Sequence, residues 1–63
     1  MRFYVQIQSS GGNWVDTLGT DNILSAAEQM RYQIREYKET ARIVERKDKV
    51  LYDDVEKLNR DCS

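Results

Sequence analysis

The chain has 63 residues, with 10 basic and 11 acidic side chains, and the net charge of −1 gives no overall attraction to nucleic acid or to anionic membranes. A single cysteine and the lack of histidine exclude an internal disulfide and a histidine-containing zinc site as stabilising elements. We expect one domain over residues 1–63, which buries only about 60% of the surface that the unfolded chain exposes. So small a core favours self-association, most simply as a homodimer.

Two strands are predicted at the start of the chain. Apolar and polar side chains alternate over residues 2–8, which predicts a strand with one buried face. Residues 9–13 read Ser-Ser-Gly-Gly-Asn, which favours a turn. Residues 14–18 predict a second strand that completes a hairpin. We expect Trp14 and Leu18 to share a face of this strand and Gly19 to end it.

A helix is predicted next, from about Ala26 to about Glu39. Ser25 and Glu28 have the spacing of a capping box, in which each side chain bonds to the backbone N–H of the other residue. Ile23 and Leu24 are expected to lie under the helix start. An apolar stripe faces the core and consists of Ala27, Met30, Ile34 and Tyr37. Polar side chains, Gln33 among them, are expected outside, and Tyr32 lies off the stripe.

Two further strands and a C-terminal segment follow the helix. Residues 41–46 and 50–52 predict the strands, with a turn at Lys47 and Asp48. Residues 54–63 are expected to be a short helix or a frayed tail, with Asp53 as the helix cap. The predicted fold is α+β in the order ββαββ: a four-stranded antiparallel sheet with one helix packed on one face, and a possible short C-terminal helix.

The sequence offers little for catalysis, and we expect no enzyme, cofactor or metal. Histidine, the commonest general base, is absent, and Cys62 stands next to the last residue. Gly11 and Gly12 lead into a strand, which favours a hairpin turn over a phosphate-binding loop. Asp53, Asp54 and Glu56 could bind a divalent ion in principle, but we strongly favour the other explanation, that acidic residues are common at a helix start.

One helix covers one face of such a sheet, so the other face is the candidate binding surface. With Phe3, Val5, Ile7, Ala41 and Ile43 toward the helix, the far face carries Tyr4, Gln6, Gln8, Arg42, Val44 and Arg46, with Leu51 as a further candidate. The first hypothesis is contact with another protein or a second copy, through Tyr4, Gln6, Trp14, Arg42, Val44 and Arg46.

Three alternatives stay open. Tyr4 could stack on a base of single-stranded RNA or DNA while Arg42 and Arg46 hold phosphates. A dimer could act as a sponge that clamps an anionic nucleotide with Arg35, Arg42 or Arg46. The face could also be an ordinary polar surface. Trp14 is expected to cap the open end of the core, and its alternative role is an exposed anchor in a binding surface.

Residues 1–8 lead into an alternating strand and not into the apolar run of a signal peptide, and no apolar run reaches membrane-spanning length. Together with the unpaired cysteine, this favours the cytoplasm. The layout of residues 3–52 is Phe-Tyr-Val-Gln-Ile-Gln, Gly-Gly-Asn-Trp-Val-Asp, a helix, Ala-Arg-Ile-Val-Glu-Arg and Val-Leu-Tyr. It resembles short uncharacterised ββαββ proteins of phages and bacteria. That resemblance implies a small factor that acts by binding host or defence components.

Overall fold

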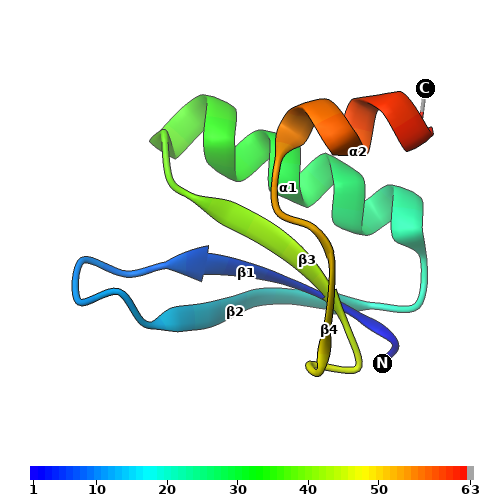
Figure 1. Cartoon of the computed structure of the whole chain (residues 1–63), viewed down its shortest axis with the longest axis horizontal. Helices are drawn as coiled ribbons and strands as arrows, with labels where there is room; N and C mark the ends of the chain where they lie inside the picture. Colours follow the sequence, from blue (N-terminus) through cyan, green and yellow to red (C-terminus); the bar gives the residue numbers. More distant parts are fainter. Residues whose placement is uncertain (63) are drawn as a thin grey trace.

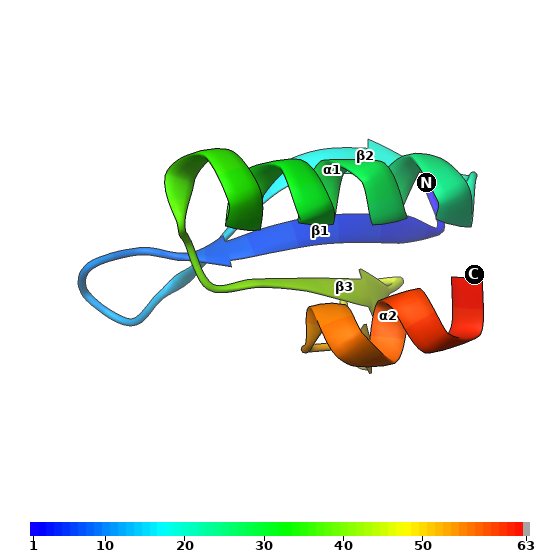
Figure 2. The same ribbon diagram turned by 90° about the horizontal axis from the view of Figure 1, so that it is seen from above.

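A four-stranded antiparallel sheet carries two helices on the same face in the computed structural model, which describes residues 1–62 (Figures 1 and 2). The elements in chain order are β1 (Phe3–Gln8), β2 (Trp14–Thr20), α1 (Ile23–Tyr37), β3 (Ala41–Glu45), β4 (Lys49–Tyr52) and α2 (Val55–Cys62). The strand order across the sheet is β2-β1-β3-β4. The predicted ββαββ fold is confirmed, and residues 55–62 form a helix.

The core lies between the sheet and the helices. The five residues expected to face the helix do so: Val5, Ala41 and Ile43 are buried, and Phe3 and Ile7 pack against them. From the helices, Ala26, Ala27, Met30 and Leu58 are fully buried. Leu58 belongs to α2, so the C-terminal helix completes the core, and complete burial of a leucine side chain stabilises a fold by about 1.5–3 kcal/mol. The side chain of Cys62 lies outside the described part of the chain.

Helix α1 begins three residues earlier than predicted, because Asn22 and not Ser25 is its cap. The Asn22 backbone is extended, and its Oδ1 atom accepts a hydrogen bond of 2.9 Å from the Leu24 N–H. Ser25 is thus already helical, and the predicted capping box is wrong. The helix ends at Tyr37 because Lys38 adopts the left-handed conformation, with φ of 53°.

The earlier start also changes which side chains α1 buries. Leu24 is 59% exposed and Tyr37 is 58% exposed, so neither lies in the core as predicted. Gln33, expected on the outside, is buried. In α2 the cap is Asp54 and not Asp53, since Asp54 Oδ1 accepts from the Glu56 N–H at 2.9 Å.

A register shift in the first hairpin corrects the prediction for β2. Leu18 lies opposite Val5, whereas Asp16 lies opposite Gln6, so Thr17 is an extra residue at this point, and its hydroxyl donates to the Val5 carbonyl at 3.1 Å. A one-residue shift moves the following side chains to the other face. Leu18 therefore packs on the core while Trp14 does not share its face. Gly19 does not end the strand, which runs on to Thr20.

The second hairpin turns one residue earlier than predicted. Arg46 and Lys47 have φ of 54° and 67°, and the Asp48 N–H donates to the Glu45 carbonyl at 3.2 Å. The pair Glu45–Lys49 encloses three turn residues, and positive φ at two successive positions is a conformation for which hairpin turns normally use Asn-Gly. For a residue other than glycine, this left-handed backbone conformation costs roughly 1–2 kcal/mol of conformational free energy.

A register shift in the β3–β4 pair places Leu51 on the core. Ile43 pairs with Tyr52 and Val44 with Val50, which leaves Leu51 as the extra residue. Leu51 packs against the core cluster, so its predicted place on the far face is wrong. Among residues 1–62, neither helix is long and apolar enough to cross a membrane.

The cap of α1 can be tested by two substitutions three residues apart. Asn22→Ala removes the hydrogen bond to the Leu24 N–H and should lower the free energy of unfolding by about 1 kcal/mol. Ser25→Ala should change it by less than about 0.5 kcal/mol, because Ser25 is exposed within the helix. Urea unfolding followed by circular dichroism measures both. If Ser25→Ala lowers the free energy of unfolding as much as Asn22→Ala or more, Ser25 and not Asn22 is the cap.

Candidate interaction surface

The face of the sheet opposite the helices carries a connected group of polar and aromatic side chains, which we call the open face. It consists of Tyr4 and Gln6 from β1, Trp14 and Asp16 from β2, Arg42 and Val44 from β3, and Lys47 from the following turn. The register places them together, since Gln6 lies between Asp16 and Arg42, and Tyr4 lies opposite Val44. Both helices lie on the other side of the sheet (Figure 1).

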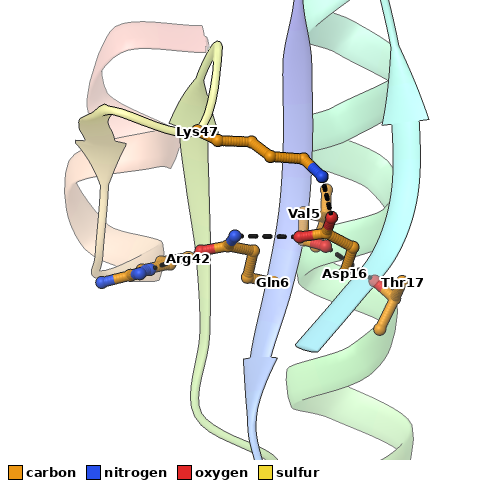
Figure 3. Close-up of polar contacts among 6 residues, drawn as sticks. All are labelled: Val5, Gln6, Asp16, Thr17, Arg42 and Lys47. Carbon is orange, nitrogen blue, oxygen red and sulfur yellow. Dashed lines mark hydrogen bonds and ion pairs between the residues drawn. The ribbon is translucent and has the colours of Figure 1, made fainter. Parts of the chain in front are cut away.

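Gln6 is the centre of this group and is only 8% exposed. Its Nε2 atom donates to Asp16 Oδ1 at 2.9 Å, and its Oε1 atom accepts from Arg42 Nε at 2.9 Å (Figure 3). A buried amide without partners would be costly, and here both ends are satisfied. Gln6 therefore fixes the positions of one anion and one cation on neighbouring strands.

Arg42 lies over the indole ring of Trp14. The guanidinium carbon is 3.9 Å from the ring centroid, which is a close cation–π contact. The hairpin that carries Trp14 bends toward the β3 side of the sheet (Figure 2). Trp14 is half-buried, and it is not among the apolar side chains packed against the core cluster. The prediction that Trp14 caps the core is therefore wrong, and its ring belongs to the open face.

Lys47 closes the other end of the group. Its Nζ atom lies 2.8 Å from Asp16 Oδ2 and 4.7 Å from the Tyr4 ring centroid. The hydrogen bond from Lys47, followed by the one from Gln6, lowers the pKa of Asp16 below its ordinary value of 3.8. The same hydrogen bond to Asp16 raises the pKa of Lys47. Asp16 and Lys47 are therefore both charged over the whole neutral range.

Tyr4 lies against a strand residue that has no side chain. Gly19 is opposite Tyr4, and a Cβ atom built on Gly19 would lie 3.0 Å from Tyr4 Cε1. The tyrosine ring occupies the space that a side chain on β2 would fill. A side chain at position 19 would therefore crowd the ring that contacts the Lys47 ammonium group.

Four of the six predicted binding residues come together on the open face, and two do not contribute as expected. Tyr4, Gln6, Trp14 and Arg42 are joined by the contacts above. Val44 is on this face but only 2% exposed, so it has almost no surface to offer a partner. Arg46 lies in the turn, where its N–H donates to the Arg2 carbonyl at 2.7 Å.

Asp16 and Lys47 are the site residues that sequence reasoning missed. The alternation of Trp14 with Asp16 along one strand could have placed Asp16 beside the tryptophan. No comparable signal existed for Lys47, because its position depends on a left-handed turn without glycine. Arg35, which the nucleotide-sponge hypothesis named with Arg42, lies on α1, where its Nε atom donates to Glu36 at 3.2 Å. Arg35 and Arg42 are therefore on opposite sides of the sheet.

A shallow hollow of about 310 Å³ lies on the outer side of α1 and is lined by Glu28, Arg31, Tyr32 and Arg35. Tyr32 meets Tyr37 edge to face with ring centroids 5.7 Å apart, and a hydrogen bond between their hydroxyls raises the pKa of Tyr32. Arg31 donates to Asn59 of α2 at 2.8 Å, which ties the two helices together. Because one helix supplies all of its lining, the hollow is a surface depression and not an enclosed pocket.

Comparisons of the chain with protein-family models, with curated proteins and with solved structures find no match. Function is therefore inferred from the residues of the open face alone.

The contact between Arg42 and Trp14 can be measured with a double-mutant cycle. We expect Arg42→Ala, Trp14→Leu and their combination to show a coupling free energy of about 0.5–1 kcal/mol, because a half-exposed cation–π pair has this size and leucine has no ring that could bind the cation. Urea unfolding gives the four stabilities. Additive losses would mean that the two side chains do not interact.

The pH dependence of stability tests the Asp16–Lys47 pair. Asp16 has a lowered pKa in the folded chain, so its contribution is present above the unfolded pKa and is lost as the pH falls through the folded pKa. Asp16→Asn should therefore be less stable than the native chain at pH 6, and this difference should shrink as the pH falls below 3.8.

Unfolding of both chains in urea between pH 2 and pH 7 measures the difference. Arg2 lowers the pKa of Glu45, but Glu45 titrates equally in both chains, so its contribution cancels from the difference in stability. A difference that stays constant with pH would show that Asp16 does not contribute through its charge.

Proposed function

We propose that this chain is a non-enzymatic interaction module that binds another protein through the open face. The observation that carries this proposal is a tryptophan, a tyrosine and an arginine held together on the one sheet face that neither helix covers. These three residue types are the ones most enriched at the energetic centres of protein interfaces. Self-association, which we also propose for so small a core, belongs to the same class of function.

The order of the side chains supports binding as well as their type. Gln6, Asp16 and Lys47 hold Arg42 and Tyr4 in place before any partner arrives. Immobilising a free arginine or lysine side chain at an interface costs about 0.5–1.5 kcal/mol. A face whose long side chains are already fixed avoids part of this cost.

Single-stranded nucleic acid is the second candidate, because two aromatic rings and two cations lie on one face. Three features favour a protein partner instead. Arg42 and Lys47 already cover one side of each ring, so a base that stacks there must displace a cation held by another hydrogen bond. Asp16 adds a carboxylate to the middle of the face, and the chain as a whole carries a net charge of −1.

The setting that we propose is the cytoplasm of a bacterium or of an infected host cell, and the partner that we propose is a host or defence component. Nothing in the proposed binding mode requires a cofactor.

Selection from a random peptide display library tests the proposal without knowledge of the partner. Peptides selected on the native chain should lose at least tenfold in affinity for the double variant Trp14→Ala, Arg42→Ala, because that variant removes the central contact of the open face. The matched control is Tyr32→Ala, Arg35→Ala, which removes the same kinds of side chain from the outer side of α1. Circular dichroism spectra of both variants serve as the control for folding.

Equal binding of the selected peptides to the native chain and to the open-face variant would contradict the proposed surface. Sedimentation velocity over a range of concentrations tests self-association of the same three chains. A native chain that stays monomeric at every concentration and selects no peptide would remove the proposed function altogether.

A further inference from the structure

Arg42 is held on two sides and has two unused hydrogen-bonding groups. Its Nε atom donates to Gln6, and its guanidinium plane lies on Trp14. Among residues 1–61, whose side chains the structure describes, no hydrogen bond or ion pair is made by its two terminal amino groups. Figure 3 shows these terminal nitrogens on the side of Arg42 that faces away from Gln6.

An arginine in this state is prepared to bind an anion. The guanidinium group presents its donors in a fixed planar fork that matches the two oxygens of a carboxylate, and charge-assisted bonds of this kind are about twice as strong as neutral ones. The ring of Trp14 and the amide of Gln6 restrict rotation of the side chain, so little freedom is lost when an anion arrives.

The charges on the open face favour an isolated carboxylate over a polyphosphate. Arg42 and Lys47 are its two cations, but Lys47 is already paired with Asp16 at 2.8 Å. A nucleic-acid backbone that crosses the face would bring further phosphates toward the Asp16 carboxylate. A single acidic side chain can bind Arg42 without approaching Asp16.

A second copy of this chain is a poorer occupant of this site. The same face of a partner copy would bring an excess of positive charge, Arg42 and Lys47 against Asp16, toward an identical excess. Exposed apolar surface lies on the same side of the sheet, because Val50 of β4 lies opposite Val44 and is 46% exposed. The matching segment therefore combines an acidic residue with an apolar one.

We infer that Arg42 recognises a glutamate or aspartate side chain of a partner protein, within a segment that also places an apolar residue on Val50. This inference rests on the proposed function, since it names the chemistry of the partner that the open face binds. The two terminal amino groups of Arg42 donate hydrogen bonds to the two carboxylate oxygens, while Trp14 and Gln6 keep the guanidinium plane in position.

The test uses two ten-residue peptides with uncharged ends. The first contains the sequence Glu-Gly-Ser-Leu, and the second has Gln in place of Glu and so differs from the first only in charge. Nuclear magnetic resonance follows the Arg42 Nε–H and the Trp14 indole N–H during titration. The Glu peptide should shift both signals and bind at least fivefold more tightly than the Gln peptide. Arg42→Lys keeps the charge but removes the fork, and it should weaken the Glu peptide at least fivefold. The matched control Arg35→Lys should not change its affinity.

Several results would overturn the inference. The first is the absence of a shift with the Glu peptide at millimolar concentration, and the second is equal binding of the Glu and Gln peptides. The third is an Arg42→Lys chain, shown to be folded, that binds as tightly as the native chain. Tighter binding of a ten-residue oligothymidine at 150 mM salt would assign the free edge of Arg42 to phosphate instead. The proposed function is judged separately, because the library selection can yield neutral peptides that still depend on the open face.

Discussion

The structure of the open face depends on one buried amide. Gln6 is a polar side chain with only 8% of its surface exposed, on a face of the sheet that neither helix covers. Its donor and its acceptor must both find partners in the chain, because the water that would otherwise serve them is excluded. Asp16 and Arg42 meet that requirement at 2.9 Å each. Lys47 is then fixed through Asp16, and the Trp14 contact through Arg42.

The network also solves a problem of size. Within residues 1–62, which the structure describes, both helices lie on one face of the sheet, and no further element covers the other face. Long side chains with apolar stems can protect such a face while their charged ends stay in water. Val44 shows that they do so here, because it lies on the open face and is still only 2% exposed. The side chains that cover this face of the sheet are thus the same ones that we propose to contact a partner.

The periodic part of this architecture could be predicted from the sequence. The alternation in residues 2–8 and 41–46 placed the correct side chains on the core, and from this the fold class and the open-face positions of Tyr4, Gln6 and Arg42 follow. The errors arose where one residue departs from the period. The extra residue Thr17 in β2 moved Leu18 to the core and left Trp14 on the open face. A bulge is defined by the pairing with the neighbouring strand, so its position in β2 could not be read from that strand alone.

Local backbone signals were misread for a related reason. Asn22 and Ser25 are both good caps, and the choice between them depends on whether Ile23 can reach the core, which is a tertiary property. The turn at Arg46 and Lys47 violates the usual preference for Asn-Gly, so no sequence pattern predicts it. The position of Lys47 over Tyr4 depends on that turn, so its place on the open face could not be predicted from the sequence.

The unusual turn and the buried amide lead to the same view of how a partner is bound. Left-handed backbone at residues other than glycine persists only where surrounding contacts hold it, and for Lys47 these contacts are Asp16 and Tyr4. A partner that displaced Lys47 or Gln6 would lose the contacts that compensate for a strained turn and a buried amide. A partner that adds hydrogen bonds to the outer edge of Arg42 leaves every one of these contacts in place. Binding by addition to the network, and not by replacement of its members, is therefore the mode that this small sheet can best support.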